Sequence, residues 1–123
     1  MPSIPIISVV DDNDALRRAL ENLIRSAGLR AQGFSSAEAF LRSDQVDGTS
    51  CLILDMRMPG MNGLELQHQI GEANQHMPII FLTAHRDADQ RTQALEAGAV
   101  AFLYKPFHEE ELLNAINAAL KHL

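Results

Sequence analysis

The sequence predicts an α/β fold: a doubly wound, five-stranded parallel sheet of strand order 2-1-3-4-5, flanked by five helices, as in flavodoxin-like folds. Five short apolar segments alternate with five segments of helical periodicity along the 123 residues. Strict alternation of this kind favours a parallel sheet covered on both faces. The first, third and fourth apolar segments run almost unbroken, which is typical of central strands buried on both sides.

The composition describes one domain spanning residues 1–123. With 46% hydrophobic and 21% charged residues, the chain can bury a core without metals or disulfides. The single cysteine, Cys51, agrees with a reducing cytoplasm, where we expect this protein to reside. A net charge of -6 argues against direct contact with nucleic acid, and no apolar run is long enough for a membrane span. Any C-terminal DNA-binding domain is expected to be absent from this chain.

Two strands and two helices are predicted before the longest apolar run. Residues 4–10 are nearly all apolar and β-branched, as a strand requires. Residues 16–27 carry apolar side chains at helical spacing, with Arg17 and other charged residues on the opposite side. Residues 29–34 form a weaker strand, which we place at the sheet edge because polar side chains interrupt it.

A short helix follows the second strand. Ser35 and Glu38 have the Ser-x-x-Glu spacing of a capping box, which predicts that Ser35 caps this helix. Ala37 and Phe40 are expected to face the core. Residues 44–50 then form a polar loop.

The longest apolar run, residues 51–54, ends at Asp55 and is followed by the turn residues Pro59 and Gly60. Such a run indicates a strand buried on both faces. Asp55 then lies at its carboxyl end, where open α/β sheets place their ligands. A lone carboxylate at this position is also compatible with a helix cap, so its interpretation depends on what ends the other strands.

The second half of the chain continues the alternation of helix and strand. Its predicted elements, in order, are residues 63–73, 79–82, 87–97, 100–104 and 108–123. The helix over 87–97 is poorly amphipathic, because Ala88, Leu95 and small side chains are nearly all that it can bury. A weakly attached helix fits an element with two conformations.

Polar side chains end the strong strands and are expected to converge at one edge of the sheet. They are Asp11 and Asp12, Asp55, Thr83, and Lys105. Neighbouring strands lie about 5 Å apart, so these ends share a cleft. Each residue alone has a plausible structural role, but three carboxylates together repel one another unless a cation lies between them. Carboxylates without His or Cys ligands suit Mg²⁺, and a carboxylate beside a metal and a lysine is equipped to form an aspartyl phosphate.

Four motifs resemble the receiver domain of two-component response regulators, and the resemblance covers essentially the whole chain. They are Val9-Val10-Asp11-Asp12, the segment from Leu54 to Gly63, Leu82-Thr83-Ala84, and Tyr104-Lys105-Pro106-Phe107. The Thr-Ala-His and Lys-Pro-Phe segments resemble the FixJ/NarL-like transcriptional regulators in particular.

This resemblance implies a role for each strand end. Asp55 is the expected phosphoacceptor for a sensor histidine kinase. The expected Mg²⁺ ligands are Asp12, Asp55 and the backbone carbonyl of Arg57, with Asp11 acting through a bound water. The expected contacts of the phosphoryl group are Thr83, Lys105 and the backbone amides of Arg57 and Ala84.

The resemblance also implies a phosphorylation-driven switch. Thr83 would move toward the phosphate and Phe102 would turn inward, which remodels the face of the fourth helix, fifth strand and fifth helix. The expected outputs are a homodimer or control of an output domain, with transcription regulated through that separate DNA-binding domain. A cis peptide bond is expected before Pro106. The side chains of Arg57 and His85 either tune the lifetime of the phosphate or are simply solvated, and both interpretations stay open.

A Mg²⁺-dependent phosphohydrolase that works through an aspartyl phosphate is the alternative function. Such hydrolases typically carry a second acid two residues after the nucleophile, where it protonates the leaving group. Arg57 occupies that position here. We therefore expect a protein that is not an enzyme toward other substrates and catalyses only its own phosphorylation and dephosphorylation.

Overall fold

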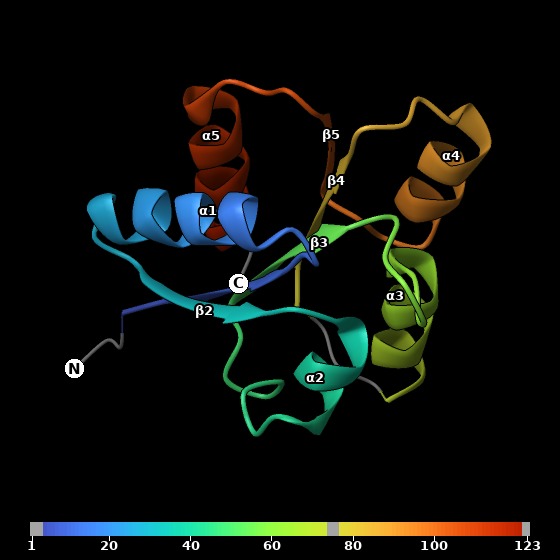
Figure 1. Ribbon diagram of the computed structural model, residues 1–123, viewed down its shortest axis with the longest axis horizontal. Helices are drawn as coiled ribbons and strands as arrows, with labels where there is room; N and C mark the ends of the chain where they lie inside the picture. Colours follow the sequence, from blue (N-terminus) through green and yellow to red (C-terminus); the bar gives the residue numbers. More distant parts are fainter. Residues whose placement is uncertain (1–3, 74–76, 122–123) are drawn as a thin grey trace.

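The computed structural model of the protein describes residues 4–73 and 77–121 and confirms the predicted architecture (Figure 1). The parallel sheet has the order β2-β1-β3-β4-β5. Its strands are β1 (Ile6–Val10), β2 (Arg30–Phe34), β3 (Cys51–Asp55), β4 (Ile79–Thr83) and β5 (Ala101–Tyr104). The helices are α1 (Asp14–Ser26), α2 (Ala37–Arg42), α3 (Gly63–Glu72), α4 (Ala88–Glu96) and α5 (Glu109–Leu120). The predicted end of the last helix, residues 122–123, lies outside the described residues.

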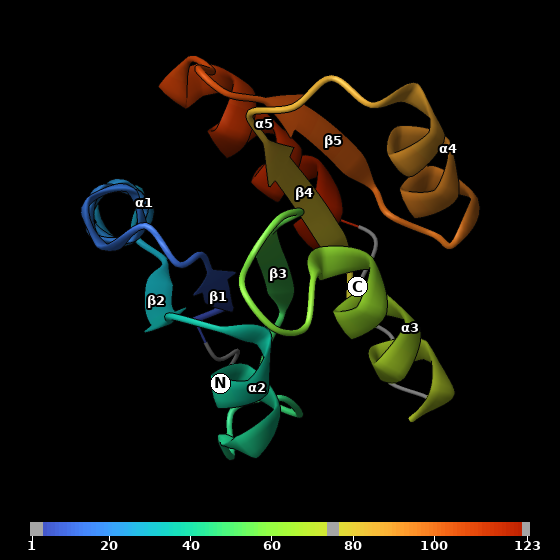
Figure 2. The same cartoon turned by 45° about the vertical axis from the view of Figure 1, so that its right-hand side comes forward.

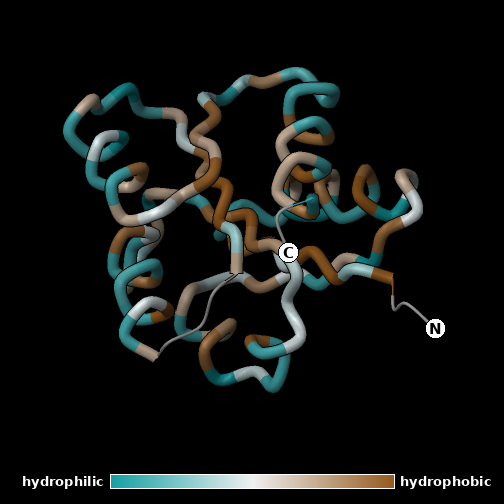
Figure 3. The backbone as a smooth tube through the Cα atoms, turned by 180° about the vertical axis from the view of Figure 1, so that it is seen from behind, coloured by the Kyte–Doolittle hydropathy of each residue, from teal (hydrophilic) through white to brown (hydrophobic). Residues whose placement is uncertain are grey.

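The helices cover the two faces of the sheet unequally (Figures 1 and 2). Successive strand residues point to opposite faces, so Val9 and Ile53 pack beneath α1 and α5. Leu52 and Leu54 pack on the other face, beneath α2, α3 and α4. Figure 3 shows hydrophobic residues concentrated along the strands, whereas the helices mix hydrophobic and hydrophilic residues. No helix in the described part of the chain is both long enough and apolar enough to cross a membrane.

The strand register brings the acidic strand ends together. Val10 in β1 pairs with Leu54 in β3, and Asp55 pairs with Leu82 in β4. Asp11 directly follows Val10, so it emerges beside Asp55 at the carboxyl edge of the sheet. The parallel pairing thus creates the cleft that the sequence predicts.

The predicted cap of α2 is wrong by one residue. Ser36 is the N-cap, and its hydroxyl accepts the Ala39 N–H at 3.0 Å. Glu38 therefore does not close a capping box with Ser35, and its carboxylate accepts the Met61 N–H instead. Two adjacent serines are equally suitable caps, and the path of the chain out of β2 decides between them.

Helix α4 is as poorly amphipathic as predicted, but its buried residue is different. Ala94 is fully buried, whereas Ala88 is exposed and Leu95 is 37% exposed. The backbone carbonyl of Ala94 accepts a hydrogen bond from the buried Gln67 amide of α3 at 3.0 Å. This contact with α3 turns the Ala94 side of the helix inward and leaves Leu95 at the surface.

We expect Asn62→Ala to lower the free energy of unfolding by about 1 kcal/mol, because Asn62 is the N-cap of α3. Its side chain accepts the Glu65 N–H at 2.9 Å, and the Glu65 carboxylate accepts the Asn62 N–H in return. Denaturant unfolding measures the change. The control is Asn114→Ala at an exposed interior position of α5, and equal stability of the two variants would contradict the prediction.

Candidate functional site

The loop after β1 supplies two acids in different environments. Asp11 is 1% exposed, whereas Asp12 is exposed. The Asn13 N–H donates to Asp11 Oδ1 at 2.9 Å, and the Arg17 guanidinium donates to the Asp11 carbonyl oxygen at 2.8 Å. Asp11 is therefore held by its backbone and by its side chain, while the Asp12 carboxylate remains accessible.

Asp55 ends β3 with its carboxylate in the cleft and is 7% exposed. Burial, and then the neighbouring charge of Asp11, raise the pKa of Asp55 to about 6, an effect that Lys105 partly opposes. Its shortest backbone donor is the Arg57 N–H, at 3.4 Å from Oδ1. Asp55 is thus a carboxylate whose charge is poorly compensated by the protein.

Lys105 reaches into the cleft from the end of β5, as predicted. Its Nζ lies 3.2 Å from Asp11 Oδ2 and 3.7 Å from Asp55 Oδ1. The Lys105 N–H donates to the Thr83 carbonyl at 2.7 Å, which ties the lysine backbone to the end of β4. The peptide bond between Lys105 and Pro106 is cis, as the resemblance implies.

Asp11, Asp12 and Asp55 form a group suited to a divalent cation. Each offers a carboxylate oxygen, and these atoms lie within 4.8 Å of one another. An all-oxygen donor set with an exposed member fits Mg²⁺, which retains several waters and takes few carboxylates. One lysine does not balance three carboxylates, so a bound cation would also relieve their mutual repulsion.

The fourth strand end, Thr83, lies beside this group but is bonded to its own loop. Thr83 is 1% exposed, and its hydroxyl accepts the His85 N–H at 3.1 Å. Ala84 follows with an exposed methyl group, which leaves its surroundings open. The side chains of Arg57 and His85 are likewise exposed, and their influence on phosphate lifetime stays a prediction.

Phe102 belongs to an aromatic row on β4 and β5. Its ring is 6.0 Å from that of Phe81 and 5.5 Å from that of Tyr104, and it is only half-buried. The Arg86 guanidinium stacks over the Tyr104 ring at 4.3 Å, a distance typical of cation–π contacts. The row, together with Arg86, therefore links β5 to β4 and to the loop that follows Thr83.

Sequence reasoning missed the part played by Arg17, which it placed on the solvent side of α1. The Arg17 side chain is only 14% exposed, and it also donates to Asp14 at 2.7 Å. Part of the signal was available, because Arg17 follows Asp14 by three residues, about one helical turn.

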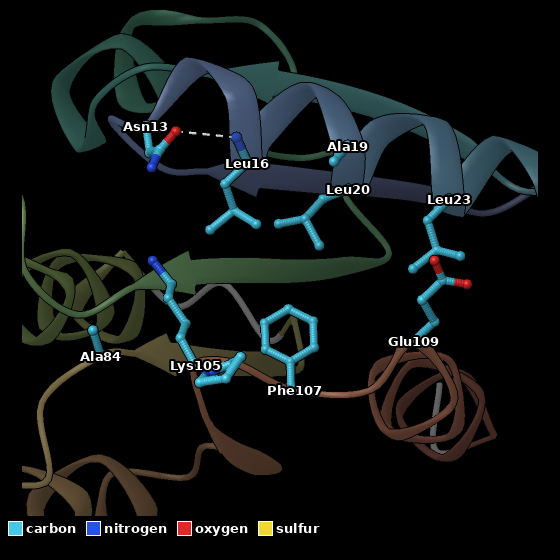
Figure 4. Close-up of a pocket in the computed structure, with 10 residues that line it drawn as sticks. Asn13, Leu16, Ala19, Leu20, Leu23, Ala84, Lys105, Phe107 and Glu109 are labelled. Carbon is cyan, nitrogen blue, oxygen red and sulfur yellow. Dashed lines mark hydrogen bonds between the residues drawn. The ribbon is translucent and has the colours of Figure 1, made fainter.

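An apolar groove of about 540 Å³ adjoins the acidic group, between α1 and the segment after β5 (Figure 4). Leu16 and Leu20 line it from α1, and Phe107 lines it from the other side. Lys105 also lines the groove, and its Nζ lies 3.2 Å from Asp11 Oδ2 and 3.7 Å from Asp55 Oδ1. A partner seated in this groove would lie next to Asp55.

Comparison with known proteins agrees with this geometry. Residues 7–117 match the family described as the response regulator receiver domain. The chain is 49% identical over 116 residues to the response regulator protein TodT of Pseudomonas putida, covering 94% of this chain and 51% of TodT. It spans about half the length of curated relatives such as TodT.

Solved structures show the same fold. The response regulator StyR superposes with a TM-score of 0.91 and 45% identity, covering 98% of this chain and 61% of StyR. FixJ-N superposes with a TM-score of 0.87 and 34% identity, covering 100% of this chain and 98% of FixJ-N. The family match over residues 7–117, joined to the acidic cleft and its lysine, shows that the chain belongs to the receiver domains of two-component response regulators.

Proposed function

We propose that this domain is a phosphorylation-activated switch that accepts a phosphoryl group on Asp55 from a sensor histidine kinase. The observation that carries the proposal is the buried Asp55 carboxylate, with Lys105 Nζ 3.7 Å away and two further acids beside it. A pKa of about 6 leaves this carboxylate mostly ionised at pH 7 and therefore able to act as a nucleophile. The apolar groove beside Lys105 offers the kinase a docking surface that adjoins the acceptor.

Each residue at this edge of the sheet has a separate role in the proposed phosphoryl transfer. Asp55 attacks phosphorus, and the bond from phosphorus to the donor atom of the kinase breaks. Lys105 neutralises charge on the transferred group, and the hydroxyl of Thr83 and the amides of Arg57 and Ala84 donate to its oxygens. Asp12, Asp55 and the Arg57 carbonyl would hold Mg²⁺, with Asp11 acting through a bound water, and the ion supplies further charge neutralisation.

The conformational output is proposed to pass from Thr83 to the face formed by α4, β5 and α5. To reach the phosphate, the Thr83 hydroxyl exchanges its present bond with the His85 N–H. Phe102 is only half-buried and can then turn inward. Helix α4 buries a single side chain, Ala94, so moving the helix disrupts few core contacts.

Two exposed apolar side chains support the proposal that this face is an interface. Leu95 is 37% exposed and Val100 is 46% exposed, and both belong to the face that the switch remodels. We propose that this face forms a homodimer after phosphorylation or contacts an output domain, and that the protein acts in the cytoplasm. Its relatives include the transcriptional regulatory protein FixJ of Azorhizobium caulinodans, which supports transcription as the output, with DNA bound by a separate domain.

We expect the protein to gain one phosphate when it is incubated with Mg²⁺ and a small acyl-phosphate donor. Mass spectrometry detects the adduct, and excess chelator should abolish it. We propose that this domain catalyses only its own phosphorylation and dephosphorylation. Because it does not turn the donor over as an enzyme does, the adduct on Asp55 is expected to be long-lived. Rapid multiple turnover without retained phosphate would instead support a phosphohydrolase. Gel filtration before and after phosphorylation tests the output, and unchanged mobility would contradict dimerisation.

A further inference from the structure

Glu38 joins helix α2 to the loop that follows Asp55. Its Oε2 accepts the Met61 N–H at 3.0 Å, across 23 residues of sequence. This hydrogen bond is the largest cause that lowers the pKa of Glu38 below its ordinary value. Because Ser36 caps the helix, the Glu38 carboxylate does not form a capping box with Ser35 and reaches the loop instead.

Gly60 shows that the loop is shaped around this carboxylate. Its φ of +78° lies in the left-handed region that favours glycine. A Cβ atom at this position would lie 2.6 Å from Glu38 Oε2. The backbone conformation favours glycine here, and any larger residue would displace the Glu38 carboxylate from its present position.

The loop over residues 56–62 is attached at each end by its own backbone. The Met56 N–H donates to the Leu82 carbonyl, and the Gly63 N–H donates to the Met56 carbonyl, both at 3.0 Å. Between these attachments lies Arg57, whose N–H faces Asp55 Oδ1. In the described part of the chain, two helix side chains form hydrogen bonds with this loop: Glu65 of the helix that directly follows it, and Glu38 of α2. Glu38 is the one that comes from a distant part of the sequence.

We propose that Glu38 is a positioning residue for the Asp55 site: it holds the tip of the loop so that the backbone of Arg57 faces Asp55. This inference rests on the proposed function, in which the Arg57 carbonyl is a Mg²⁺ ligand and the Arg57 amide contacts the phosphoryl group. Without the Glu38 bond, the loop samples other conformations and presents that carbonyl and amide less often. Both Mg²⁺ affinity and the rate of phosphorylation then fall.

The test compares Glu38→Ala and Glu38→Gln with Ser36→Ala. Mg²⁺ affinity is measured on the unphosphorylated protein from the rise in melting temperature with Mg²⁺ concentration, and phosphorylation is followed by mass spectrometry. We expect Glu38→Ala to weaken Mg²⁺ binding about tenfold and to slow phosphorylation about tenfold, as losses of supporting contacts at metal sites do. Glu38→Gln should retain most of the Mg²⁺ affinity and most of the phosphorylation rate, because its amide oxygen can still accept the Met61 N–H.

Ser36→Ala is the matched control, since it removes the hydrogen bond to the Ala39 N–H in the same helix without touching the loop. It should lower stability and leave Mg²⁺ affinity unchanged. The positioning role is overturned if Glu38→Ala binds Mg²⁺ like the wild type, if Ser36→Ala weakens binding equally, or if Glu38→Gln behaves like Glu38→Ala. A wild-type protein that binds Mg²⁺ but takes up no phosphate would overturn the proposed function alone, and the Mg²⁺ affinities would still decide the role of Glu38.

Discussion

We expect the Asp55→Asn variant to take up no phosphate and yet to be more stable than the wild type at pH 7 without Mg²⁺. An amide of the same shape is not a nucleophile, so phosphorylation stops. The amide also carries no charge, so it avoids the cost of burying a charge and the repulsion from Asp11. These two effects raise the pKa of Asp55 from 3.8 to about 6. That shift corresponds to about 3 kcal/mol. The shift already includes the opposing attraction of Lys105. Because solvent screens the charges of a partly buried carboxylate, we expect a gain of about 1–3 kcal/mol.

The stability difference depends on pH in a defined direction. The folded pKa of Asp55 is the higher one, so the folded state binds the proton more tightly than the unfolded state does. The cost of Asp55 to folding is therefore fully present above pH 6 and disappears as the pH falls toward 3.8. Denaturant unfolding at pH 7.5 and pH 4.5, with chelator present, should show a large gain for Asp55→Asn only at the higher pH.

The control for this experiment is Asp47→Asn, which changes an exposed carboxylate in the loop before β3. Exposed substitutions of this kind usually change stability by less than about 0.5 kcal/mol. Equal stability of Asp55→Asn and the wild type at pH 7.5 would contradict the prediction. It would show that the charge of Asp55 does not lower the free energy of unfolding. Increased stability together with lost phosphorylation excludes unfolding as the reason for inactivity.

The Lys105→Met variant should be phosphorylated on Asp55 about 100- to 1000-fold more slowly than the wild type. Methionine preserves much of the apolar stem but removes the cation that lies 3.7 Å from Asp55 Oδ1. Charge that develops on the phosphoryl oxygens then loses its protein counter-charge. Time courses with an acyl-phosphate donor and saturating Mg²⁺ measure the rate by mass spectrometry.

Lys105→Met should also be less stable than the wild type, in contrast to Asp55→Asn. Replacing Lys105 leaves the buried Asp11 carboxylate without the ammonium group at 3.2 Å. We expect this to lower the free energy of unfolding by about 1–3 kcal/mol. Lys121→Met, at the exposed end of α5, changes the only other lysine of the sequence and should alter neither property. A Lys105→Met rate within threefold of the wild type would remove Lys105 from the phosphoryl-binding site.

The fold and the acidic group could be predicted because they follow from local sequence patterns, namely apolar runs and the alternation of strand and helix segments. An unbroken apolar run such as residues 51–54 has one low-energy location, the centre of a sheet, and strand β3 is buried throughout. Alternation then dictated a parallel sheet, whose carboxyl ends meet at one edge. Asp11, Asp12, Asp55 and Lys105 were therefore predictable as neighbours before any distance was known.

Predictions failed where two local solutions had similar energies. Ser35 and Ser36 are equivalent caps by composition, and the structure selects Ser36. Leu95 is more apolar than Ala94, but α4 packs against α3 through Ala94 and leaves Leu95 exposed. For α4 the deciding contact comes from α3, elsewhere in the chain. For α2 the path of the chain out of β2 decides.

The sequence by itself therefore determined the order of the elements, the sheet that they form and the acids and lysine at its edge, because periodicity and strand ends are local properties of the chain. Only the tertiary structure decided which polar side chains support that edge. Arg17 bonds the Asp11 carbonyl and Glu38 bonds the Met61 amide. Both are charged helix residues that belong at the surface by pattern, and each acquires its partner because folding brings a backbone group within about 3 Å of it.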